Sequence, residues 1–262
     1  MNHPGEPIPH QPVLYHEVLD ALRPESGRFY VDGTLGAGGH AEGILSRSAP
    51  LGTLLGLDLD SQAITISKRR LLPFGARVII RQASYAHLPE ILSQLGWQHV
   101  HGILLDLGVS SMQIDQPGRG FSFQSDAPLD MRFNQETGSS AADLVNTLSE
   151  AQLSKVLWEF GDERYSRRIA KAIVAARPIA TTMELADLIK KTVPGYDAHI
   201  HPATRTFQAL RIATNQELET LAKALPNLAA CLAPGGRMAV ISFHSLEDRI
   251  VKQFFKKESQ DC

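Results

Sequence analysis

The sequence predicts an α/β protein in which a parallel β-sheet is interrupted by a helical insert. Short apolar stretches alternate with helical ones early in the chain, which is the pattern of a parallel sheet covered on both faces. A long segment without this alternation, roughly Asp115 to Pro202, separates this region from a last apolar stretch. The glycine-rich turn YVDGTLGAGGH, Tyr30 to His40, follows the first stretch and is typical of nucleotide-binding sheets.

Five strands and their connections account for the alternating regions. The first, Gly27 to Leu35, runs into the glycine loop, and Ala41 to Ser46 opens the helix that follows. A Pro-Gly-Gly turn, residues 234–236, is expected to lead into the last strand. The four later strands are predicted at Gly52 to Asp60, Arg77 to Ile80, Gly102 to Val109 and Arg237 to Phe243.

The insert reads as a helical subdomain. Apolar residues recur there at helical spacing, first at Leu153, Val156, Leu157 and Phe160 and then at Ile169, Ala172, Ile173 and Ala176. The expected domains are therefore 1–114 with 203–262 for the sheet, and 115–202 for the insert. Basic residues on the opposite helix faces either meet phosphates or form a solvated surface. They are Arg164, Arg167, Arg168, Lys171 and Arg177.

Composition limits the class of protein. A formal net charge of −2 excludes a globally basic nucleic-acid binder but permits a local basic face. No segment approaches the roughly 20 apolar residues that span a membrane, and the proline-rich start resembles neither a signal peptide nor a transit peptide. Cys231 and Cys262 form no Cys-x-x-Cys pair, which favours a reducing compartment, the cytoplasm, and argues against structural zinc. The oligomeric state stays open, a dimer included.

Polar residues stand where the predicted strands end. Asp32 ends the first strand, Asp58 follows Gly38 by twenty residues, and Asp106 ends the fourth strand. Ligands of open α/β sheets bind outside the carboxyl ends of the strands. The fifth strand delivers further polar residues there, Ser242 to Ser245 and then Glu247 to Arg249. Each acid alone could be a helix cap or a turn former, but together they indicate a site.

Charge helps to choose between two ligands for the glycine loop. Gly36, Gly38 and Ala41 fit the dinucleotide spacing G-x-G-x-x-A. Two like charges about 4 Å apart, however, repel by ~4 kcal/mol at an effective dielectric constant of ~20, so Asp32 would oppose a pyrophosphate. S-adenosylmethionine (SAM) carries a sulfonium, an amino group and no phosphate, and its carboxylate suits the N–H groups of a glycine loop. Asp32 and Asp106 therefore favour SAM over NAD.

Longer motifs follow one another along the chain: YVDGTLGAGGH, GILLDLGVSSMQID, RGFSF, PLDMRF, HPATRTFQALRI and PGGRMAVISFHSLEDRIVK. In order and spacing they resemble the bacterial 16S ribosomal RNA cytosine-N4 methyltransferases, or RsmH/MraW family, and the resemblance runs from about His10 to Lys256. It implies a Rossmann-like class I SAM-dependent methyltransferase sheet with an inserted all-helical, substrate-binding subdomain. It also implies methyl transfer from SAM to the exocyclic N4 of a cytosine in the decoding region of 16S rRNA, within the small ribosomal subunit.

The same resemblance implies site residues. Gly38, Gly39 and His40 would hold the methionine end of SAM and Asp58 its ribose. Asp106 and Gln113 follow from DLGVSSMQ, and Tyr85 matches an aromatic position beside the adenine. Without the motif context, the glycines could simply form a turn, His40 could cap a helix and Tyr85 could be core packing.

Methyl transfer to an amino nitrogen needs orientation, hydrogen-bond acceptors for the amino protons and exclusion of water. Asp106 is the expected acceptor. The chain reads D-L-G-V where amino-directed DNA methyltransferases carry D/N/S-P-P-aromatic, so other residues must hold the base by stacking and edge hydrogen bonds. The candidates are Phe121, Phe123, Arg205, Phe207, Ser242 and His244. The histidines of HIHP, 199–202, are expected to bind substrate or to be structural, and no metal ligation is predicted.

The carboxyl-terminal region departs from the pattern. Sheets of this type usually add two strands after the fifth, whereas this chain ends at FFKKESQDC. We therefore expect either that this chain is shortened or that its sheet stays open at that edge, which would leave unpaired backbone there and weaken the wall on the substrate side. Two alternative functions stay open on the sequence alone: a NAD-dependent oxidoreductase, and a non-catalytic RNA-binding or assembly protein.

Overall fold

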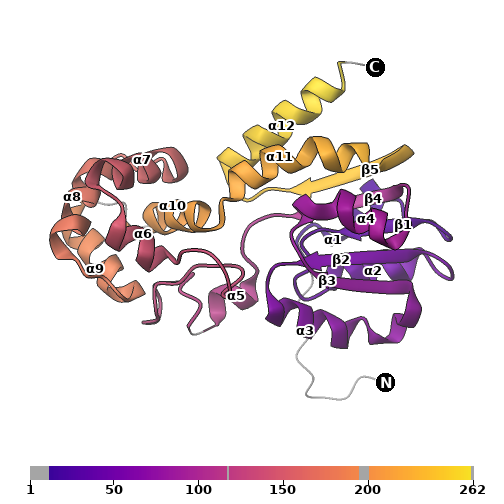
Figure 1. Cartoon of the computed structure of the whole chain (residues 1–262), viewed down its shortest axis with the longest axis horizontal. Helices are drawn as coiled ribbons and strands as arrows, with labels where there is room; N and C mark the ends of the chain where they lie inside the picture. Colours follow the sequence, from indigo (N-terminus) through magenta and orange to yellow (C-terminus); the bar gives the residue numbers. More distant parts are fainter. Residues whose placement is uncertain (1–11, 117, 195–200, 261–262) are drawn as a thin grey trace. The chain divides into compact units, whose positions relative to one another are not determined.

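The computed structural model describes residues 12–116, 118–194 and 201–260 (Figure 1). The chain forms two compact units, one within Met1–Gly108 and Leu221–Cys262 and the other within Val109–Thr220. The second unit is longer at both ends than the insert expected at 115–202. At its carboxyl end the reason is helix α10 (Thr204–Asn215), which packs on α7 (Glu150–Gly161) of the same unit.

The first unit contains a parallel sheet with the strand order β3-β2-β1-β4-β5. Its strands are β1 (Phe29–Asp32), β2 (Thr53–Asp58), β3 (Val78–Gln82), β4 (Val100–Asp106) and β5 (Leu232–Ile241). The chain moves outward in one direction from β1 to β3 and then returns to the other side of β1 with β4. This reversal between β1 and β4 is the switch point at which open α/β sheets bind ligands.

Helices cover both faces of this sheet because strand residues alternate between two apolar clusters. Val31, Leu55 and Leu105 pack with α4 (Leu88–Leu95), α11 (Glu217–Ala230, within this unit from Leu221) and α12 (Ser245–Glu258). Tyr30, Leu54 and Leu104 pack on the other face with α1 (Tyr15–Leu22), α2 (Gly39–Arg47) and α3 (Ser61–Arg70). Two short 3-10 helices, Leu72–Arg77 and Tyr85–His87, complete the connections. The five predicted strands and the covering helices are thus confirmed.

Strand β5 differs from the prediction at its start. The Pro-Gly-Gly segment lies within the strand, where the register shifts so that Val100 pairs with Leu232 but Gly102 pairs with Arg237. Gly235 takes a φ of 77°, a left-handed conformation that glycine adopts at no steric cost, so the turn is a bulge in the strand. Within the described residues β5 pairs with β4 alone.

The second unit is helical and has its own core. Its helices are α5 (Ser111–Asp115), α6 (Ala141–Thr147), α7, α8 (Ser166–Ala176), α9 (Thr182–Thr192) and α10. Helices α6, α7 and α9 begin with capping boxes, in which the cap side chain and the third helical residue satisfy each other's backbone N–H groups. Buried Leu153, Leu157, Ile169 and Ile173 contribute to the core. In the described ranges, no helix combines the length and apolar character that a membrane crossing requires.

Candidate cofactor and methyl-transfer site

The glycine loop turns sharply at the carboxyl end of β1. The Gly33 N–H donates to the Leu104 carbonyl at 2.9 Å, so the loop stays close to the end of β4. A Cβ atom at Gly33 would lie 2.6 Å from Leu105 Cδ2, which leaves no room for a side chain. Gly38 has a φ of 79° and caps the start of α2, whose first residue is Gly39. The loop therefore presents backbone rather than side chains at the beginning of a helix, as an anionic group of a ligand requires.

Three carboxyl groups stand around this loop. Asp32 is 1% exposed; burial raises its pKa to about 7, against the opposing hydrogen bond from the Thr34 amide, and the charges of Asp106 and Asp58 raise it further. Burial also raises the pKa of Asp106 to about 6, with a second contribution from the charge of Glu247. Burial raises the pKa of Asp58 as well. Acids that repel one another in a buried site favour a cationic ligand and disfavour a phosphate.

Asp58 is fixed by the backbone. Its Oδ2 accepts the Gly36 N–H at 2.8 Å and its Oδ1 accepts the Asp60 N–H at 2.9 Å. These bonds tie the carboxylate at the end of β2 to the glycine loop. Each carboxylate oxygen has a second lone pair, so Asp58 can still accept hydrogen bonds from the two hydroxyls of a ribose.

His40 reaches Asp106 from the first turn of α2. Its Nε2 lies 3.7 Å from Asp106 Oδ2. Burial lowers the pKa of His40 to about 4, against a smaller opposing effect of the Val13 backbone, so the imidazole is neutral near pH 7. Among the described residues, Asp106 Oδ1 has no hydrogen-bond partner. A buried acceptor without a partner beside a neutral histidine suits a donor that a substrate brings.

The remaining predicted cofactor residues lie in different units. Tyr85 follows β3 and is half-buried, and its Cβ is 3.0 Å from the position a Gly33 Cβ would occupy, so it stands at the glycine loop. Gln113 belongs to the second unit, where its side-chain oxygen accepts the Ser110 N–H at 3.0 Å in the capping box of α5. The structure thus brings Gly38, Gly39, His40, Asp58, Tyr85 and Asp106 to the carboxyl end of one sheet. The contact of Gln113 with a cofactor stays a prediction.

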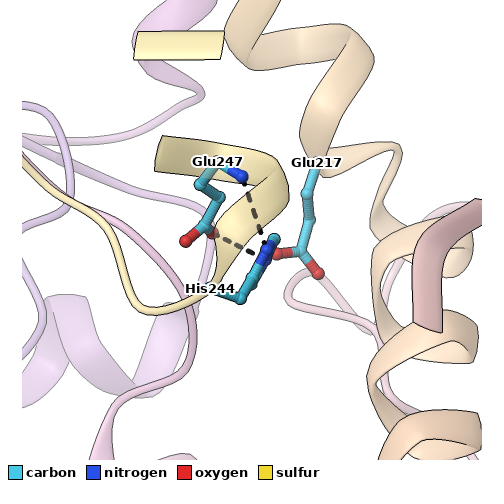
Figure 2. Close-up of side chains that lie close together, drawn as sticks. All are labelled: Glu217, His244 and Glu247. Carbon is cyan, nitrogen blue, oxygen red and sulfur yellow. Dashed lines mark hydrogen bonds and ion pairs between the residues drawn. The ribbon is translucent and has the colours of Figure 1, made fainter. Parts of the chain in front are cut away.

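The turn after β5 is fixed by the buried Glu247, which the sequence predicts only as part of the polar run from Glu247 to Arg249. Glu247 is 2% exposed, and its Oε2 accepts the Phe243 N–H at 2.9 Å. His244 caps α12 by accepting the Glu247 N–H at Nδ1, and its Nε2 lies 3.2 Å from Glu247 Oε1 (Figure 2). A cap residue followed three positions later by glutamate is the capping-box spacing, and this signal could have identified Glu247. Ser242 is half-buried beside this turn.

The aromatic base-holding candidates of the second unit pack against its core. Phe207 is 4% exposed and meets Phe123 edge-on at 4.9 Å, so stacking of a base on Phe207 would require the core to open. Phe123 also stacks on His201 at 4.5 Å, and Phe121 pairs with Phe133 at 5.7 Å. Phe207 is therefore a core residue, because helical spacing on α10 turns it inward. His199 lies outside the described residues.

The basic residues of the insert separate into two groups. Arg164, Arg167, Arg168 and Lys171 are exposed, and so is Arg205, which donates to the Asp162 carbonyl at 3.2 Å. Arg177 instead donates to the carbonyls of Val145 and Leu148, which end another segment of the same unit. The guanidinium group of Arg177 thus stabilises its own unit through backbone hydrogen bonds and is not free to bind a phosphate.

A parallel sheet with a glycine loop and an acidic carboxyl edge at its switch point is the arrangement expected of a Rossmann-like methyltransferase. The chain belongs to the MraW methylase family, whose sequence profile matches residues 7–262. The chain is 54% identical to ribosomal RNA small subunit methyltransferase H of Syntrophotalea carbinolica, over 98% of this chain and 83% of that protein. It is 55% identical to the protein of the same name from Geotalea uraniireducens, over 97% and 83%, and 53% identical to that from Dehalococcoides mccartyi, over 97% and 73%.

Proposed function

We propose that this chain transfers a methyl group from SAM to the exocyclic N4 of a cytosine in the decoding region of 16S rRNA, in the cytoplasm and within the small ribosomal subunit. The observation that carries the proposal is the acidic carboxyl edge of the sheet, in a member of the MraW methylase family. Relatives more than half identical over nearly the whole chain are named ribosomal RNA small subunit methyltransferase H, which supports the substrate class.

The residues present fit SAM. The backbone at Gly38 and Gly39 would receive its carboxylate, Asp32 and Asp106 would compensate its positive charges, and Asp58 would accept the ribose hydroxyls. SAM, when bound, would supply a methyl group activated by its positive sulfonium, with a neutral thioether as the leaving group.

Asp106 is the residue proposed to handle the proton. When the bond from N4 to the methyl carbon forms, the nitrogen must lose one proton. Within the part of the chain that the structure describes, Asp106 Oδ1 at the end of β4 is an acceptor without a partner. A pKa of about 6 leaves this carboxyl group ionised at neutral pH while keeping it basic. Neutral His40 beside it adds no positive charge that would weaken this base.

Calorimetric titration with SAM and NAD tests the cofactor. SAM is expected to bind and NAD is not, because the carboxyl groups would repel a pyrophosphate. Asp58→Ala should weaken SAM binding at unchanged stoichiometry. Binding of NAD without SAM would contradict the proposal, and unchanged SAM affinity in Asp58→Ala would remove the ribose role.

A further inference from the structure

The D-L-G-V segment at the end of β4 lacks an aromatic residue, and one stands just beyond the end of the neighbouring strand, β5. Phe243 is 55% exposed, although large apolar side chains in this unit are mostly buried in its two clusters. A single exposed aromatic residue is ordinary on a protein surface. Two features distinguish Phe243 from an ordinary exposed aromatic residue: its position near the end of β4 and the hydrogen bond that holds its backbone.

Phe243 lies two residues beyond the end of β5, next to the segment that continues from Asp106. Asp106 and Ile241 are partners in the register of β4 and β5, and the Leu107 N–H donates to the Ile241 carbonyl at 3.0 Å. Phe243 follows Ile241 by two residues, as Gly108 follows Asp106. A Cβ at Gly108 would lie 3.4 Å from Phe243 Cδ2, so the ring adjoins the backbone that continues from Asp106.

The backbone under this ring is held in place. The Phe243 N–H donates to Glu247 Oε2 at 2.9 Å, and Glu247 is buried in the first turn of α12. A charge-assisted hydrogen bond of this kind is stronger than one between neutral groups. Gly108 has a φ of 88° and carries no side chain that could cover the ring. A largely exposed aromatic ring therefore extends from a turn whose backbone is hydrogen-bonded to a buried carboxylate.

We infer that Phe243 is the stacking platform for the target cytosine, a positioning residue that holds the base beside Asp106. This inference rests on the proposed function. An enzyme that modifies a base takes it out of its helical stack and replaces the lost stacking with aromatic or apolar side chains. Phe121, Phe123 and Phe207 are engaged in the core of the second unit, whereas the Phe243 ring is exposed beside the chemistry.

Three variants of Phe243 test the platform in methyl transfer to unmethylated small ribosomal subunits. Phe243→Ala and Phe243→Leu should both lower kcat/KM for the subunit by about 5-fold to 150-fold, the range for loss of one base–aromatic stack. Phe243→Trp should restore most of the activity, because an indole ring also stacks. The SAM affinity of these variants should stay within about 2-fold of the wild-type value. Phe255→Ala, which removes an exposed ring on α12, is the control and should have the kcat/KM of the wild type.

The outcomes separate this inference from the proposed function. Wild-type kcat/KM in Phe243→Ala, or full activity in Phe243→Leu, would overturn the platform, the latter because apolar bulk without a ring would then suffice. If the wild type transfers no methyl group at all, the proposed function fails, and fluorescence still decides the inference. The wild type contains two tryptophans, Trp97 and Trp158. Cytidine 5′-monophosphate should quench the tryptophan fluorescence of Phe243→Trp more strongly than that of the wild type. Equal quenching in both proteins would contradict stacking.

Discussion

Replacement of Asp32 by asparagine measures how much stability the folded protein loses when this buried carboxyl group ionises. Asp32 is 1% exposed and its pKa is raised from 3.8 to about 7. At 1.36 kcal/mol per pH unit this shift costs the folded state ~4 kcal/mol once Asp32 is ionised. Because the folded pKa lies above the unfolded one, Asp32 lowers the free energy of unfolding as the pH rises from about 4 to about 7. An asparagine side chain at this position would not ionise, and its oxygen can still accept the Thr34 N–H.

The assay is urea unfolding of the wild type and Asp32→Asn at pH 5 and pH 8.5 without SAM. Relative to the variant, the wild type should lose ~3 kcal/mol of unfolding free energy between these two values, since part of the shift is already complete at pH 5. The comparison across pH cancels any constant packing effect of the substitution. An equal pH dependence of both proteins would refute the claim that Asp32 is buried with a raised pKa.

Three further predictions follow from the same geometry. SAM binding at pH 6.5 should release protons, since its positive charges lower the raised pKa values of Asp32 and Asp106, and calorimetry in buffers of different ionisation enthalpy should detect this; proton uptake would contradict it. Glu247→Gln removes a charge that raises the pKa of Asp106, so the acid limb of the profile of kcat/KM against pH should move to lower pH. An unchanged acid limb would show that the charge of Glu247 does not act on the group that titrates. Arg177→Ala should cost ~1 to 3 kcal/mol in unfolding free energy and leave the salt dependence of RNA binding unchanged, whereas Arg167→Ala should reduce that slope by about one unit; the reverse pattern would exchange their roles.

Much of the first unit can be predicted because its signals are local. Buried strands read as short apolar runs, and each of β1, β2 and β4 ends in the acid that the structure places at the carboxyl edge. The Pro-Gly-Gly segment predicts a turn before β5, because such a turn usually ends a connection. In the structure Gly235 forms a bulge inside the strand, and no local signal distinguishes the two arrangements.

The sequence pattern does not show the direction of a side chain where that direction depends on tertiary packing. Phe207 and Arg177 have the chemistry of a base clamp and a phosphate ligand, yet the fold turns one into the core and uses the other to satisfy backbone carbonyls. Apart from its capping-box spacing, Glu247 resembles its acidic neighbour Asp248 in the sequence, because its burial exists only in the fold. Phe243 is absent from the base-holding candidates because exposure, too, is decided only in the folded chain.

Transfer of a labelled methyl group from SAM to small ribosomal subunits that lack the modification tests the central claim most directly. The account predicts that the label is incorporated into 16S rRNA and, after nuclease digestion, is recovered as N4-methylcytidine from the decoding region. Asp106→Asn should abolish most of this incorporation while the subunit still binds. RNA binding by the wild type without methyl transfer, or recovery of the label on another base, would contradict the account.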